Sequence, residues 1–102
     1  MNNPQNINKT INYQEGSVVS KEIVNKSTGT ITLFAFDKGQ GLSEHTAPYN
    51  ALVIVTDGTA QITLSGINHK VETGEMLLMP KNSTHSLKAI KQFKMMLIMI
   101  KS

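Results

Sequence analysis

Two histidines are the side chains of this chain that are best suited to chemistry. His45 lies shortly after a glycine-rich turn, and His85 lies shortly after Pro80. Imidazole is the side chain that most readily exchanges a proton near neutral pH, and it is also the commonest metal ligand in proteins. If the two rings meet in space, they predict either a metal site or a polar pocket able to transfer protons.

A metal bound by these histidines would need further ligands. Zinc in catalytic sites usually has three protein ligands, and iron(II) oxygenases commonly use two histidines and a carboxylate. Glu44 is unsuitable because it neighbours His45 and points to the opposite face of a strand. Asn50 or Gln40 is the candidate third ligand, and Tyr49 is a further candidate residue of the pocket.

Without a metal, the same two side chains have two other uses. They can hydrogen-bond to each other, to water or to a ligand in a small polar pocket. A neutral imidazole can also act as a general acid or base, with its pKa set by its neighbours. The residues alone leave these uses open beside metal binding.

Short runs of Val, Ile, Leu and Thr must position these side chains. Gly, Pro, Asn or Asp interrupts the runs about every 8–12 residues, a rhythm typical of an all-β sandwich or barrel. Several runs alternate between apolar and polar residues, as strands do, and no segment has the apolar spacing of a helix longer than a turn or two. The predicted strands are 18–24, 30–36, 43–46, 51–55, 60–64, 69–72, 76–79, 85–89 and 93–100.

Three dipeptides predict the turns between these strands. Asp57-Gly58 and Ser65-Gly66 are typical of tight β-hairpins, because their residue types accept positive φ angles. Thr73-Gly74 predicts a third turn. We therefore expect the chain to reverse at Asp57-Gly58, between two separate strands.

The spacing around the histidines resembles the two sequence motifs of the cupin superfamily. The resemblance is to small single-domain bacterial cupins of the cupin-2 conserved-barrel, RmlC-like type. The first motif runs Gly, five residues, His-x-His, and then Glu and Gly; the second runs Gly, five residues, Pro-x-Gly, two residues, His, and then Asn. The matching positions are Gly39, His45, Gly58, Gly74, Pro80 and His85.

This resemblance implies an all-β fold, an antiparallel jelly-roll β-barrel, with His45 and His85 close together at its mouth. Metal-binding cupins hold iron, manganese, nickel, zinc or copper with three histidines and one glutamate. Two of those four positions are here Ala47 and Ala51, which have no lone pair to donate. Asn82 replaces the glycine of the second motif, and Asn tolerates the left-handed conformation that such a turn needs.

The ends of the chain differ from its middle. Residues 1–12 are polar and rich in Asn, which predicts a flexible N-terminal arm before a single cupin barrel domain at 13–102. The last strand is almost wholly apolar, so both of its faces need cover. A strand buried on both sides within one chain is one explanation. We favour a homodimer interface built from Met96, Ile98 and Ile100.

Composition narrows the classes of function. The chain has no cysteine, which excludes disulfides and thiolate metal sites. Its net charge of +3 comes from scattered lysines without arginine, so nucleic-acid binding has little support. The N-terminus lacks the apolar region of a signal peptide, and the longest apolar run is too short to span a bilayer. We therefore expect a cytoplasmic protein that binds no membrane.

These features predict a small cupin-barrel protein whose two-histidine pocket binds a metal ion, a small molecule or both. One alternative is a metal-dependent dioxygenase or isomerase acting on a small substrate, although the two alanines weigh against a dioxygenase. Another is a ligand-sensing accessory module that acts through a protein partner. The sequence names no substrate and does not decide whether the chain is an enzyme.

Overall fold

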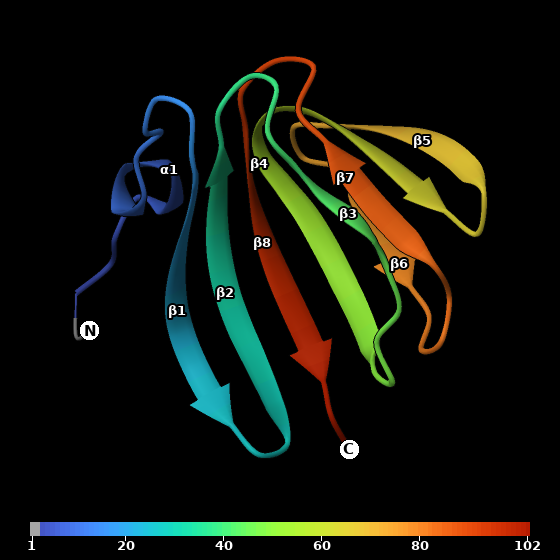
Figure 1. The fold of residues 1–102 in the computed structure, drawn as a ribbon. Coiled ribbons are helices and arrows are strands. Elements are labelled where there is room, and N and C mark those ends of the chain that lie inside the picture. The colour runs from blue at the N-terminus through green and yellow to red at the C-terminus, as the bar shows by residue number, and fades with distance from the viewer. Residues whose placement is uncertain (1–2) are drawn as a thin grey trace.

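The fold is an antiparallel β-barrel preceded by one turn of helix (Figure 1). The computed structural model describes residues 3–102. The elements are α1 Ile7–Thr10, β1 Val18–Lys26, β2 Gly29–Phe36, β3 Gly41–His45, β4 Asn50–Leu64, β5 Ile67–Glu72, β6 Met76–Met79, β7 His85–Lys88 and β8 Phe93–Ile100. The predicted all-β antiparallel barrel is confirmed, as is the expectation of no helix beyond a turn or two.

The long strand β4 connects the two sheets of the barrel. Its first half pairs with β8 and β6, and its second half pairs with β5 and β7. The first sheet therefore has the order β1-β2-β8-β4-β6, and the second has the order β5-β4-β7-β3. Every pairing is antiparallel, as in a jelly roll.

The prediction of a hairpin at Asp57-Gly58 is wrong. β4 continues through this dipeptide, and its register with β8 shifts between Val55 and Asp57, which is a β-bulge. Gly58 has a φ of +74°, and a Cβ atom added there would overlap the carbonyl oxygen of Gln92. A bulge bends a strand and increases its twist. The dipeptide thus marks the point where β4 passes from one sheet to the other.

The other two turns lie where the sequence places them. Ser65 and Gly66 have φ angles of 49° and 81°, as a type I′ hairpin between β4 and β5 requires. Gly74 has a φ of +87°, and its N–H donates to the carbonyl of Val55 at 2.8 Å. These turns bring β5 and β6 back along β4.

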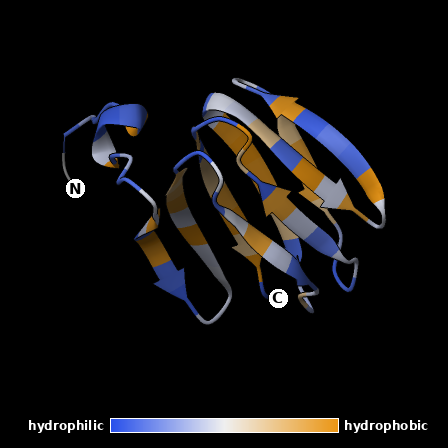
Figure 2. Ribbon diagram, turned by 45° about the horizontal axis from the view of Figure 1, so that its top comes forward, coloured by the Kyte–Doolittle hydropathy of each residue, from blue (hydrophilic) through white to orange (hydrophobic). Residues whose placement is uncertain are grey.

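Aromatic and branched side chains fill the interior of the barrel. The rings of Phe36 and Phe93 stack with centroids 4.4 Å apart, and both side chains are fully buried. Val53, Ile62 and Met95 are equally inaccessible to solvent. Hydropathy mapped on the ribbon places the hydrophobic residues on the barrel strands, whereas α1 and β5 are largely hydrophilic (Figure 2). The core leaves the histidines at its margin.

The N-terminal segment differs from the flexible arm that its composition predicts. Ile11 is only 5% exposed and belongs to a small apolar cluster with Leu33 and Ala35. The buried ammonium of Lys94 donates a hydrogen bond to the carbonyl of Asn8. From Ile7 onward, this segment is therefore docked against the outside of the first sheet. The first two residues of the predicted arm lie outside the described residues.

Candidate functional site

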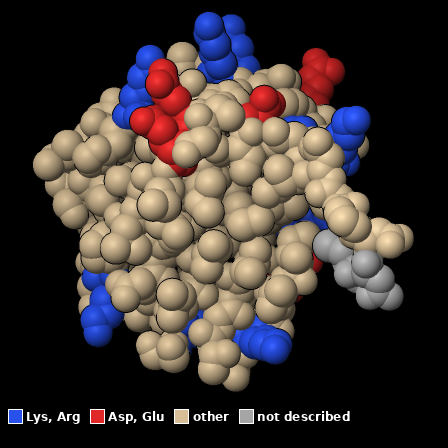
Figure 3. All heavy atoms as spheres, turned by 180° about the vertical axis from the view of Figure 1, so that it is seen from behind, with Lys and Arg blue, Asp and Glu red and all other residues tan. Residues whose placement is uncertain are grey.

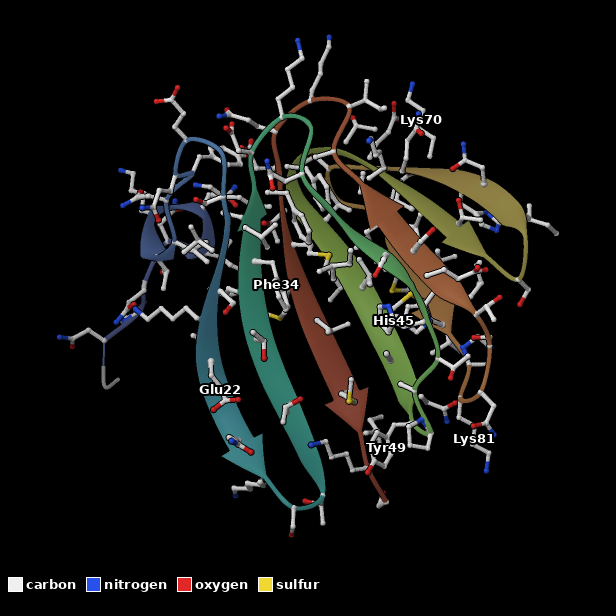
Figure 4. The ribbon with its side chains drawn as sticks, in the orientation of Figure 1. Glu22, Phe34, His45, Tyr49, Lys70 and Lys81 are labelled. Carbon is white, nitrogen blue, oxygen red and sulfur yellow. The ribbon has the colours of Figure 1, made fainter. Side chains whose placement is uncertain are left out.

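Neighbouring ends of β3 and β7 hold the two histidines. His45 is the Cα partner of His85 in the register of these strands, and Leu64 of β4 is the partner of His85 on its other side. Partners in an antiparallel pair project to the same face of the sheet. Figure 4 shows the His45 side chain within the curve formed by β3, β4 and β7. The fold therefore brings together the two histidines that the sequence singled out.

Two hydrogen bonds tie the loop after β6 to the loop after β3. The N–H of Asn82 donates to the carbonyl of Ala47 at 2.8 Å, and the N–H of Lys81 donates to Oδ1 of Asn50 at 3.0 Å. Asn82 has a φ of +67°, so the expectation that it adopts the left-handed conformation is confirmed. These bonds hold the segments before β7 and after β3 against each other.

The two imidazole rings are in direct contact. Nε2 of His45 lies 3.0 Å from Nε2 of His85, and the ring centroids lie 4.2 Å apart with an interplanar angle of 73°. Nδ1 of His45 lies 2.7 Å from the carbonyl oxygen of Ser43. His85 is buried with 6% exposure, whereas His45 is exposed to solvent. One ring is thus accessible from outside and the other lies behind it.

These contacts determine the tautomer of each neutral ring. The carbonyl of Ser43 only accepts hydrogen bonds, so Nδ1 of His45 carries the proton and its Nε2 has a free lone pair. Nε2 of His85 must then donate to that lone pair. Nδ1 of His85 is left as an acceptor, and it is buried without a hydrogen-bond partner among residues 3–102. The pair ends in one unsatisfied acceptor, a feature that calls for an explanation.

The environment of His85 favours its neutral form. Burial lowers the pKa of His85 below 6.5, because desolvation disfavours the charged ring, and the neighbouring His45 lowers it further. The backbone of Ser83 acts in the opposite direction without giving Nδ1 a well-formed hydrogen bond. Near pH 7 the buried ring is therefore uncharged.

The donor set does not fit a resident metal ion. His45 alone has the tautomer of a metal ligand, with Nδ1 bonded to a carbonyl and a lone pair on Nε2, but that lone pair already accepts the N–H of His85. His85 would have to move its proton from Nε2 to Nδ1, which has no well-formed hydrogen bond among residues 3–102. Ala47 and Ala51 supply no donor atom, and residues 3–102 contain no group of three or more His, Cys, Asp or Glu able to hold a metal.

The other predicted pocket residues have contacts of their own. Oδ1 of Asn50 already accepts the N–H of Lys81, and Gln40 precedes the first residue of β3 whereas His45 is its last. The ring of Tyr49 has the ammonium of Lys101 5.6 Å from its centroid. Within residues 3–102, neither Asn50 nor Gln40 is hydrogen-bonded to His45 or His85, and their role as a third ligand stays a prediction.

The backbone carbonyl of Ser43 is the functional group that sequence reasoning missed. It sets the tautomer of His45 and, through it, that of His85. No residue type signals this role, because the acceptor belongs to the main chain and its position depends on the local course of β3.

Comparison with known proteins identifies the family. The sequence profile of the Cupin domain family matches residues 32–101. The chain belongs to the cupin family. A cupin 2 conserved barrel domain protein from Leptotrichia buccalis is 39% identical with a TM-score of 0.89, over 91% of this chain and 45% of that one. A conserved protein of unknown function from Streptococcus pyogenes is 27% identical with a TM-score of 0.96, over 100% and 90% of the two chains.

A more distant solved structure shares the fold alone. Salicylate 1,2-dioxygenase from Pseudoaminobacter salicylatoxidans is 18% identical with a TM-score of 0.77, over 83% of this chain and 25% of the enzyme. A search of curated protein sequences found no significant match. In the part of the chain that the structure describes, no helix is long and apolar enough to cross a membrane.

Proposed function

We propose that this cupin binds a small molecule at the barrel mouth and recognises it with the His45–His85 pair. The observation that carries the proposal is the 3.0 Å contact between the two Nε2 atoms, one a donor and the other an acceptor. A hydroxyl group can accept from one nitrogen and donate to the other. The proposed ligand is therefore a small molecule whose hydroxyl replaces the ring-to-ring hydrogen bond, with the two Nε2 atoms moving apart to bind it.

Apolar side chains beside the pair support a ligand with an apolar body. Leu64 lies next to His85 in the register and is only partly buried. Leu42 of β3, the strand that ends at His45, likewise packs against the core while keeping part of its surface exposed. Ligand sites typically combine such apolar walls with a few polar groups that fix orientation. The two imidazoles supply those polar groups here.

An isomerase that transfers protons is the second candidate, and the tautomers favour it. Nε2 of His45 has a lone pair that can accept a proton from a ligand, and Nε2 of His85 has a proton that it can donate. The pair therefore offers both a base and an acid. A metal-dependent dioxygenase is not proposed, because the donor set is incomplete. Ligand sensing through a protein partner and a cytoplasmic location both stay predictions.

A screen of phenols and cyclic alcohols by thermal shift tests the proposed function. We expect at least one compound to raise the melting temperature of the wild type and of His69→Ala, since His69 lies on β5 outside the pair. The same compound should leave His45→Ala and His85→Ala unshifted, because a ligand stabilises only the state that binds it. Equal shifts in all four proteins would contradict recognition by the pair.

We also propose that a second copy of the chain covers the outer face of the first sheet. Figure 3 shows this side of the molecule with charged side chains around its edge and none near its centre. Two rows of cross-strand partners cross it, Ile31, Ile98, Leu52 and Leu78 in one and Leu33, Met96, Ile54 and Met76 in the other.

The docked arm covers one side of this face and leaves the other side open. The N-terminal segment packs against Leu33 and Met96, whereas Met76 and Leu78 at the β6 side are 68% and 55% exposed. An uncharged apolar face suits an identical face, because a two-fold dimer brings the same patch together and here no like charges meet. Of the three predicted interface residues, Ile100 is the most exposed, at 53%.

A further inference from the structure

A cavity of about 230 Å³ lies on the outer face of the second sheet, away from the histidine pair. Thr59 and Gln61 of β4 form its floor, and Lys70 of β5 stands on one side. Ile90 and Lys91, from the segment between β7 and β8, stand on the other. Figure 4 shows Lys70 at the end of the molecule farthest from Tyr49 and Lys81.

The polar groups of this cavity have few partners. Gln61 lies between Lys70 and Lys88 in the strand register, so an amide separates two ammonium groups in one cross-strand row. Within residues 3–102, no hydrogen bond uses the side chain of Gln61 or Thr59, although both residues are partly buried. The cavity therefore presents an amide N–H₂ and a hydroxyl that are free to bind a ligand.

Positive charge exceeds negative charge around the cavity. Lys70 lies 3.4 Å from the carboxylate of Glu72, and this exposed ion pair offsets one of the nearby ammonium groups. Lys88 and Lys91 form no ion pair with any residue of the described range. A bound anion would relieve their repulsion and gain charge-assisted hydrogen bonds.

We propose that this cavity binds a small oxyanion, the phosphate or carboxylate of an organic molecule. Lys70 and Lys91 would supply the charge, and Gln61 and Thr59 the neutral hydrogen bonds. Ile90 is 50% exposed beside them and offers contact to an apolar group attached to the anion. The small volume of the cavity and the carboxylate of Glu72 beside Lys70 favour a small molecule over an extended polyanion.

Titration with inorganic phosphate and phenyl phosphate, followed by amide NMR at constant ionic strength, tests the site. We expect saturable shifts at the Gln61 side-chain amide and the Thr59 backbone, with phenyl phosphate binding more tightly. The double variant Lys70→Gln/Lys91→Gln removes both ammonium groups that would bind the anion. It should weaken binding by about tenfold or more, which corresponds to ~1.4 kcal/mol or more. The control Lys21→Gln/Lys26→Gln removes the same charge from β1 and should bind like the wild type.

Two results would overturn the proposal. The first is equal loss of binding in both double variants, which would mean that only net charge matters. The second is that the wild type binds a single-stranded oligonucleotide but neither phosphate probe, and that Lys70→Gln/Lys91→Gln no longer binds the oligonucleotide. This result would make the surface a polyanion site. The melting temperature of each variant, measured without ligand, shows that the fold is retained.

Discussion

Nε2 of His85 lies 3.0 Å from Nε2 of His45, although the two residues are 40 positions apart in the chain. Strand register produces this contact, because the last residue of β3 pairs with the first residue of β7. The carbonyl of Ser43 then fixes the proton of His45 on Nδ1. A backbone group thereby decides which ring donates and which accepts at the barrel mouth.

The first prediction concerns stability as a function of pH. The pKa of His85 is lowered in the folded state, so between that pKa and about 6.5 the unfolded chain binds a proton that the folded chain does not. Stability contributed by this group is therefore complete above pH 6.5 and is lost as pH falls through the folded-state pKa. Urea denaturation from pH 7.5 to 5 should show this loss in the wild type and a smaller one in His85→Gln. Identical pH profiles would contradict the neutral buried ring.

The second prediction concerns the bulge in β4. Gly58→Ala should destabilise the fold by more than about 2 kcal/mol, since a positive φ and overlap with a fixed carbonyl act together. Gly66→Ala is the matched control, because it has a φ of +81° but nothing within 4 Å of the added Cβ. Strain in φ alone should cost about 1–2 kcal/mol. If chemical denaturation gives the same loss of unfolding free energy for Gly58→Ala and Gly66→Ala, the space beside Gly58 is not restricted.

The third prediction concerns the N-terminal segment. Ile11→Ala should lower the free energy of unfolding by about 2–5 kcal/mol, as for other buried isoleucines. Removing residues 1–12 should cost more, because Lys94 then loses its acceptor on Asn8. Ile67→Ala, at a side chain that is 63% exposed, should change stability by less than about 0.5 kcal/mol. If the truncated chain is as stable as the wild type, residues 1–12 form the flexible arm that the composition predicts.

The fourth prediction concerns the outer face of the first sheet. Ile98→Lys places a charge at the centre of the apolar rows, so sedimentation equilibrium should give the mass of a monomer for this variant and of a dimer for the wild type. Asn68→Lys adds the same charge on β5, outside this face, and should remain dimeric. A monomeric wild type would remove the proposed interface.

The sequence predicts much of this fold because strands and turns have local signals. Alternation and turn residues located the strands, except that they divided β4 into 51–55 and 60–64, and Ser65-Gly66 formed the hairpin that its residue types favour. Asp57-Gly58 carries the same local signal and forms a bulge instead. The difference lies in β8, which pairs with β4 up to and including the dipeptide, and such long-range pairing has no local signature.

Ile11 shows a similar limit at the other end of the chain. Its neighbours in the sequence are polar, so the composition predicts a flexible arm. In the structure, however, the side chain of Ile11 packs into an apolar cluster on the outside of the first sheet. For the candidate site, motif spacing predicted that His45 and His85 would meet. It did not predict their tautomers, which depend on the carbonyl of Ser43 and on the burial of one ring.

The central claim is that the histidines form a hydrogen-bonded pair, with fixed tautomers, that receives a ligand. The most direct test is a long-range ¹H–¹⁵N spectrum of the imidazole nitrogens at pH 7.5, before and after one equivalent of Zn²⁺. We predict a proton on Nδ1 of His45 and on Nε2 of His85, unchanged by zinc. A proton on Nδ1 of both rings, with both Nε2 signals shifted by the metal, would contradict the account and establish a metal centre.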